Sequence, residues 1–163
     1  AILRYAADES ECRIVVDLSA AYTPRAARVH RGFLLDRTRR RVMVRDEIEG
    51  TADAQVTWAF HTLADVRLAA DRRSAELSLG GKTLTVTVES EAEVQLRLMP
   101  LPPEPEPRQV KLPGPRGGPG YYHRLTKVGF VASGSRLAWS VGFFPDAHDV
   151  TQVPGAARPL TEW

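Results

Sequence analysis

Most of this chain alternates hydrophobic and polar residues with a period of two, the pattern of β-strands that bury one face and expose the other. The clearest run covers residues 83–88, where Leu84, Val86 and Val88 alternate with three threonines. The same alternation predicts further strand-length segments within 29–35, 42–44, 56–60, 77–79, 94–98 and 137–143.

Turn-forming residues separate these segments at short intervals, at 36–40, Glu49-Gly50, Gly80-Gly81 and 133–135. Gly80-Gly81 is the sharpest signal, because paired glycines supply the positive φ of a two-residue hairpin turn. The stretch 52–56 has some helical character but is too short to change the picture. Many short strands with close turns favour an antiparallel sandwich or barrel, and we predict an all-β antiparallel β-sandwich of many short strands.

Two regions depart from the alternation. Residues 100–120 contain eight prolines and four glycines, and proline cannot donate to a sheet ladder, so we predict a Pro/Gly-rich loop at about 100–120. The residues after Pro145 are also irregular. We therefore predict one β-sandwich domain over 1–145 and an irregular tail over 146–163, packed on the domain, with Trp163 as an anchor, or flexible.

Composition narrows the classes of protein. The 163 residues, 43% of them hydrophobic, are enough for one sizeable core. With 22 basic and 20 acidic side chains the net charge is +2, which gives no electrostatic reason to expect nucleic-acid binding. No apolar run approaches the length of a membrane-spanning helix, so none is predicted. Most cations are arginines, which would suit an anionic sugar, but Ala- and Arg-rich usage is also typical of a GC-rich genome, and composition alone does not decide between them.

The sequence carries no complete set of catalytic residues. Its four histidines lie far apart, and Cys12 is the only cysteine, so we predict no metal site, no cofactor and no catalytic residue. Asp46 and Glu47 are adjacent in a predicted strand and therefore point to opposite faces. Glu104 and Glu106 lie in the proline-rich stretch, which argues against a glycosidase pair.

Three groupings are candidates for contact with a sugar or polyanion. Tyr121-Tyr122-His123-Arg124 combines flat rings with a guanidinium, although it reads equally as the start of a strand. Trp58 and Phe60 share one strand face, so His61 points the other way, to solvent or a neighbouring domain. The basic residues within 37–41 mark a hairpin tip, where charge clusters are usually only solvated.

Several strings resemble the heparinase II/III-like family of polysaccharide lyases. They extend from about Asp17 to Val88, with looser agreement as far as Phe143-Phe144-Pro145, and they include the run from Val42 to Gly50. The family positions present here are Tyr22, Arg31, Asp46, Gly50, Trp58 and His61. We interpret them as packing, turn and strand positions, with Asp46 and Gly50 shaping the turn after a strand.

The resemblance implies a longer bacterial parent, periplasmic or secreted, in which an N-terminal α/α toroid precedes an antiparallel β-sandwich. Such enzymes cleave acidic polysaccharide by β-elimination: a base removes the proton α to the uronate carboxyl group and an acid protonates the leaving oxygen. The family's catalytic residues belong to the toroid and to a histidine-rich segment before the matched region, so none maps onto this chain.

Two functions remain open from the sequence. The chain is either the C-terminal sandwich of such a lyase, inactive alone and serving as scaffold and cleft wall for an acidic polysaccharide, or an independent carbohydrate-binding or protein-interaction module. The candidate substrate-binding residues are Tyr121, Tyr122, His123, Arg124 and His61, and the independent carbohydrate-binding reading uses Tyr121, Tyr122 and Arg124.

Overall fold

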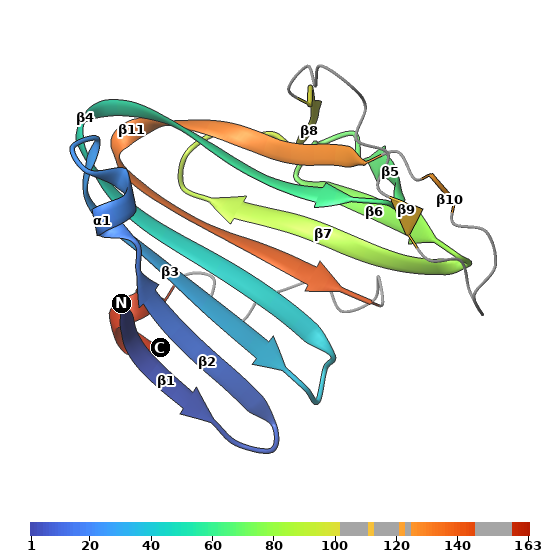
Figure 1. The fold of residues 1–163 in the computed structure, drawn as a ribbon, viewed down its shortest axis with the longest axis horizontal. Coiled ribbons are helices and arrows are strands. Elements are labelled where there is room, and N and C mark those ends of the chain that lie inside the picture. The colour runs from blue at the N-terminus through green and yellow to red at the C-terminus, as the bar shows by residue number, and fades with distance from the viewer. Residues whose placement is uncertain (102–110, 113–120, 123–124, 146–157) are drawn as a thin grey trace.

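The computed structural model describes residues 1–101, 111–112, 121–122, 125–145 and 158–163. Nine strands form one antiparallel sheet in the order β1-β2-β3-β4-β11-β7-β6-β5, with β8 paired to β11 (Figure 1). The strands of this sheet are β1 (Ile2–Ala7), β2 (Glu11–Asp17), β3 (Ala26–Asp36), β4 (Arg41–Thr62), β5 (Asp65–Leu68), β6 (Ser74–Leu79), β7 (Lys82–Ser90), β8 (Arg97–Met99) and β11 (Thr126–Phe144). The short helices are α1 (Ser19–Tyr22) and the 3-10 helix η3 (Leu160–Glu162).

Two long strands turn this single sheet into a sandwich. β4 and β11 pair along nearly their whole lengths, and the register shifts between Gly134 and Arg136. Figure 1 shows both strands doubling back at one end, so that the second half of β4, the first half of β11 and β8 form a second layer over β7. The predicted all-β sandwich is confirmed.

The strand boundaries differ from the sequence prediction at this bend. Glu49-Gly50 and 133–135 were expected to be turns between separate short strands, and 52–56 to have some helical character, but all lie within β4 or β11. The two strands remain paired on both sides of the bend, and the register shift absorbs the change of direction. The turns predicted at 36–40 and at Gly80-Gly81 are present, and both glycines have positive φ.

The main core fills the space between the two layers. Trp58 stacks on Phe130 with ring centroids 5.5 Å apart, and Phe130 meets the ring of Trp139 edge-on at 5.3 Å. Aliphatic side chains of β6, β7 and β11 complete this core, among them Leu77, Val86, Val88, Val128 and Val141. The alternating hydrophobic positions of the sequence are thus the positions that face inward.

A smaller core covers part of the opposite face of the sheet. Leu34, Met43 and Phe144 pack there, with Trp163 against them. The backbone N–H of Leu160 donates a 2.9 Å hydrogen bond to Oε1 of Glu47, and the Leu160 side chain lies over Gly32, where a Cβ would overlap it. Residues 158–163 are therefore held on the outside of β3 and β4.

Two sequence predictions concern residues that are mostly outside the described part. Of the proline-rich stretch, the structure describes residues 100–101 and the pair β9 (Lys111–Leu112) and β10 (Tyr121–Tyr122), which form a two-stranded ladder. The expected loop therefore stays a prediction. So does the division into 1–145 and 146–163, since residues 146–157 lie outside the described part.

Candidate functional site

The residues predicted to contact sugar are only partly described. His61 is exposed on β4 while Trp58 is buried, as the strand alternation predicts. His61 lies opposite Lys127 in the β4–β11 ladder. Tyr121 and Tyr122 form β10, without described side chains, and His123 and Arg124 lie outside the described residues. The sugar-binding role of this set stays a prediction.

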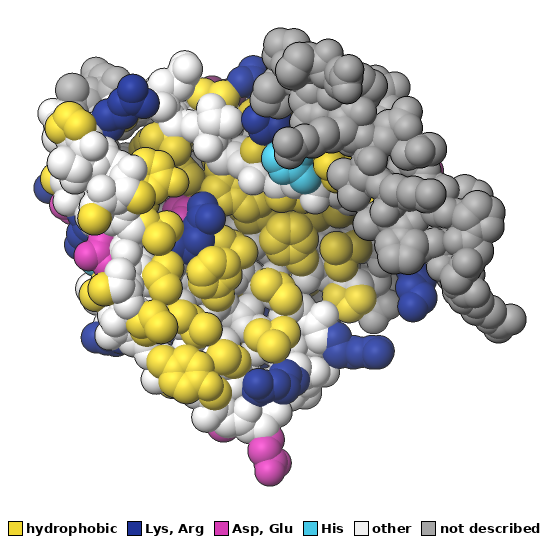
Figure 2. Space-filling view, viewed as in Figure 1, with side chains coloured by type: hydrophobic (Ala, Val, Ile, Leu, Met, Phe, Trp, Pro, Cys, Tyr) yellow, Lys and Arg dark blue, Asp and Glu magenta, His cyan; other side chains and the backbone are white. Residues whose placement is uncertain are grey.

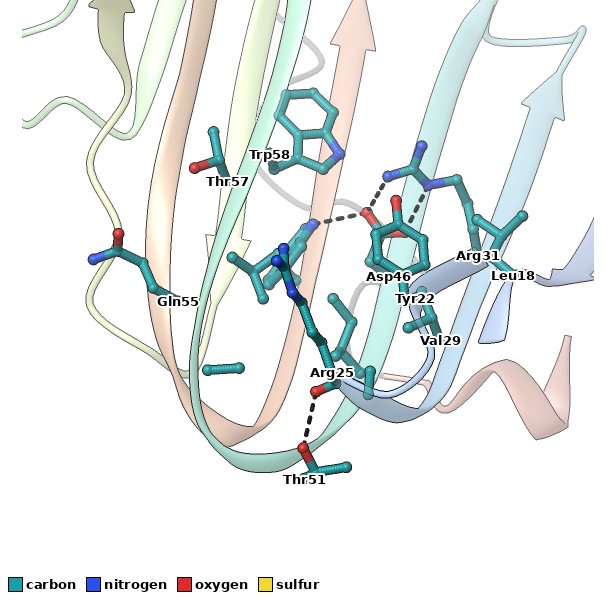
Figure 3. A pocket seen from close by; sticks show the side chains of 15 residues that line it. Leu18, Tyr22, Arg25, Val29, Arg31, Asp46, Thr51, Gln55, Thr57 and Trp58 are labelled. Carbon is teal, nitrogen blue, oxygen red and sulfur yellow. Dashed lines mark hydrogen bonds and ion pairs between the residues drawn. The ribbon is translucent and has the colours of Figure 1, made fainter. Parts of the chain in front are cut away.

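A cavity that the sequence analysis did not foresee lies at the bend of the sandwich. It has a volume of about 530 Å³ and opens between the α1–β3 segment and the bend of β4 (Figure 3). Its floor is apolar and aromatic, with Val29, Ile48, Trp58 and Trp139 among the lining residues, and Tyr22, Arg25, Arg31 and Asp46 supply polar groups. Cavities of this size take drug-sized ligands in other proteins.

A buried ion pair forms one side of this pocket. Nε and Nη2 of Arg31 donate to Oδ1 and Oδ2 of Asp46 at 2.6 and 2.9 Å, and the indole N–H of Trp139 donates to Oδ2 at 2.9 Å (Figure 3). Asp46 is 1% exposed, and both of its carboxylate oxygens accept from these donors. The expectation that Asp46 and Gly50 shape a turn is wrong, because both lie inside β4, where Asp46 stands opposite Arg31 and Trp139 in the two flanking ladders.

The guanidinium groups of the pocket differ in how they are held. Burial lowers the pKa of Arg31, but the hydrogen bond and charge of Asp46 outweigh it, so that this pKa is raised overall. Nη1 of Arg31 has no protein partner among the described residues. The exposed Arg25 guanidinium likewise has none, and Figure 3 shows its side chain reaching from the chain beside Thr51 toward the middle of the cavity.

The arginine side chains of the basic hairpin tip, 37–41, mostly bond to groups close to the tip. Arg41 and Arg39 pair with Oδ2 of Asp36 at 3.0 and 3.4 Å, and Arg37 donates to the backbone carbonyls of Asp8 and Glu11. Burial raises the pKa of Asp36, but the backbone N–H of Arg39 and the charge of Arg41 outweigh it and hold this pKa below its ordinary value. Arg39 and Arg41 thus close the β3–β4 hairpin, whereas Arg37 ties its tip to the β1–β2 hairpin.

This network predicts acid-sensitive stability. Because the pKa of Asp36 is lower in the folded chain, its contribution is complete above the unfolded pKa of about 4 and is lost as the pH falls through that value and below. Asp36→Asn should lower the free energy of unfolding at neutral pH by about 1.5 kcal/mol. Urea unfolding between neutral and acidic pH measures both effects. The exposed Asp65→Asn is the control, and an equal loss in that variant would contradict the assignment.

One face of the sheet is covered at one end and bare at the other. Cross-strand neighbours on this face form a continuous row through Val88, Val141, Val44, Phe33, Ile14 and Tyr5. Val141 is fully buried under the second layer, whereas Phe33 is 38% and Tyr5 67% exposed. The uncovered part, here called the apolar face, consists of Ile2, Tyr5, Ile14, Val16, Phe33, Leu35, Val42 and Val44.

Figure 2 shows this apolar face as a broad hydrophobic surface over the β1–β4 part of the sheet. Monomeric proteins seldom expose such large contiguous apolar areas, and those that do generally use them for contact with a partner. Among the described helices, none is long and apolar enough to cross a membrane. The described residues also contain no cluster of three or more His, Cys, Asp or Glu side chains able to hold a metal ion.

Solved structures share this fold at low sequence identity. A heparinase III gene product superposes with a TM-score of 0.63 at 8% identity, over 91% of this chain and 22% of its own. A second heparinase III structure gives 0.63 at 10% identity, over 93% and 22%. The heparan sulfate lyase HepC from Pedobacter heparinus gives 0.58 at 9% identity, over 90% and 22%.

The chain thus spans about a fifth of the length of these structures. No curated protein sequence matches it. The family model described as "Heparinase II/III-like, C-terminal" matches residues 4–110, which is more than half of the chain and includes most of the apolar face and most of the pocket. This chain therefore belongs to the heparinase II/III-like C-terminal family.

Proposed function

We propose that this chain is the C-terminal β-sandwich of a polysaccharide lyase, in which it supports the catalytic part and forms one wall of the substrate cleft. The observation that carries the proposal is the apolar face, together with the family membership. The side chains on this face of the sheet are buried at β11 but exposed or half-buried at β1–β3. Such a face is suited to burial against another part of a longer polypeptide.

The proposed partner is an N-terminal α/α toroid of the same polypeptide, and the proposed substrate is a uronate-containing polysaccharide cleaved by β-elimination. The solved structures that share the fold are heparinases and a heparan sulfate lyase several times longer than this chain, which supports a division of labour within the parent. The base and the acid of the elimination are assigned to the parent's other segments. The described side chains here supply a rigid support and a basic, aromatic cavity.

The first test is the activity of the chain alone. Incubated with heparan sulfate, it should form no unsaturated uronate product, measured by ultraviolet absorbance, whereas a protein in which a toroid precedes this chain should form it. Turnover by the isolated chain would overturn the proposal. Binding of heparan sulfate by the isolated chain that disappears in Tyr121→Ala/Tyr122→Ala would instead favour an independent carbohydrate-binding module.

The second test addresses the apolar face directly. Phe33→Asp should leave the isolated chain folded, because this side chain is already 38% exposed, yet it should lower the activity of the longer protein at least tenfold by placing a charge in the buried contact. Leu79→Asp, at an exposed apolar residue of the β6–β7 hairpin, is the matched control. Unchanged activity of the Phe33→Asp lyase would show that this face does not support the catalytic part.

A further inference from the structure

We propose that residues 158–163 act as a strap that holds the edge strand β1 in the sheet and thereby fixes the part of the apolar face that Ile2 and Tyr5 supply. The contact of that face with a partner rests on the proposed function, whereas the strap rests on contacts within this chain. The strap lies on the opposite face of the same strands, so the two faces are coupled through the sheet.

β1 is an edge strand with little support of its own. All six of its residues are exposed, and β2 is its only neighbour among the described strands. The register of the β1–β2 ladder also shifts between Ile2 and Arg4. Strands of this kind open locally more easily than central strands do. A contact from outside the ladder can therefore decide how rigidly Ile2 and Tyr5 are held.

The strap covers a row of cross-strand neighbours that begins at β1. On the face opposite the apolar face, Arg4 stands next to Val15 and Val15 next to Gly32. The Leu160 side chain lies over Gly32, where a Cβ would overlap it, and the same Cβ would lie 3.1 Å from the ring of Trp163. Val15 is only 3% exposed although its neighbour in β3 has no side chain, which fits a cover formed by the strap.

Two hydrogen bonds fasten the two ends of the strap. The backbone N–H of Leu160 donates to Oε1 of Glu47 at 2.9 Å, and Nε of Arg45 holds the same carboxylate oxygen at 3.1 Å. At the other end, Nη1 of Arg4 donates to the backbone oxygen of Trp163 at 3.1 Å. Within the described part of the chain, this is the one side-chain hydrogen bond that a residue of β1 makes. The strap thus links β4 to β1 across β2 and β3, beside the start of β1 (Figure 1).

This link makes the two faces of β1 depend on each other. Arg4 points to the strap and Tyr5 to the apolar face, because successive residues of a strand point to opposite sides. A partner that buries Tyr5 would hold β1 in place and so favour the bound strap. By the same coupling free energy, the bound strap favours the partner.

Hydrogen exchange of the full 163-residue chain tests the strap in the absence of a partner. Leu160→Ala removes the side chain that lies over Gly32 and should speed the exchange of the β1 amide protons roughly tenfold. The amides of β5, the edge strand at the other end of the sheet, should exchange at the unaltered rate. The ring signals of Tyr5 in NMR spectra should shift as well, although Leu160 lies on the opposite face.

A second variant removes the link and leaves the strap in place. Arg4→Gln deletes the hydrogen bond to Trp163, so it should speed the exchange of the β1 amides about threefold while the Trp163 indole signal stays unchanged. Arg67→Gln, at an arginine of the β5 edge, is the matched control and should leave the exchange of β1 as it is.

The outcomes are distinct from those of the lyase test. Unchanged exchange of β1 in Leu160→Ala would overturn the strap, and equal acceleration in β1 and β5 would do so too, because it would report a general loss of stability. An unchanged rate in Arg4→Gln would overturn the link to β1. Faster exchange confined to β1, in a chain whose longer form proves to have no lyase activity, would preserve the strap and refute only the catalytic proposal.

Discussion

Asp46→Asn is expected to lower the free energy of unfolding by about 3 kcal/mol, because it leaves the Arg31 guanidinium facing an amide that cannot accept both of its hydrogen bonds. The single amide oxygen also cannot accept from the Trp139 indole together with both Arg31 nitrogens, so at least one of these three donors is left without an acceptor. Because Arg31 is one-third exposed, water offsets part of the loss, and the lower end of the usual range for breaking a buried pair applies.

The control for this prediction is an ion pair of the same type on the surface. Arg67 and Glu76 pair across β5 and β6 at 3.1 Å, but the Arg67 side chain is mostly exposed, so Glu76→Gln should cost less than about 1 kcal/mol. Urea unfolding followed by circular dichroism measures both variants. A loss in Asp46→Asn no larger than that in Glu76→Gln would contradict the role given to the buried pair.

A double replacement separates the charge from the packing. Arg31→Met with Asp46→Leu removes both charges and should recover most of the stability lost in Asp46→Asn, because an apolar pair of similar volume needs no counter-charge. The indole N–H of Trp139 stays unpaired in this variant, so recovery should be incomplete.

The pattern of alternation predicted which residues face the core but not how the strands are connected. The inward positions of β7 and β11, including Val86, Val88 and Val141, follow directly from the sequence. The continuity of β4 and β11 does not, because Gly50 and Gly134 carry local turn signals, while the long-range pairing of the two strands determines the outcome. Local residue preferences cannot represent that pairing.

The pocket was beyond sequence analysis for a related reason. Its residues come from 18–31, 46–58 and Trp139, and only the registers of β3, β4 and β11 bring Arg31, Asp46 and Trp139 side by side. One signal was present in the alternation. Asp46 points to the same strand face as Val42, Val44 and Ile48, and Arg31 points to the same strand face as Val29 and Phe33. An acidic and a basic side chain on the apolar faces of neighbouring strands predict a buried ion pair.

Gly129→Ala is the second change with a large expected effect, about 3 kcal/mol of destabilisation. Gly129 lies in β11 between Ala59 of β4 and Arg97 of β8, with its neighbours Val128 and Phe130 fully buried. A Cβ there would overlap the carbonyl oxygen of Trp58 and approach Cα of Ala59 to 2.8 Å. Backbone cannot move aside as a side-chain tip can, so β4 and β11 must separate.

The matched control is Gly81→Ala in the β6–β7 turn. An added Cβ there meets nothing within 4 Å, and the cost of about 1 kcal/mol comes only from the positive φ of 75°. The melting temperature of Gly129→Ala should therefore lie well below that of Gly81→Ala. Only Gly129→Ala should alter the near-ultraviolet circular dichroism of the stacked Trp58 and Phe130 rings. Equal melting temperatures would mean that the two layers tolerate separation at Gly129.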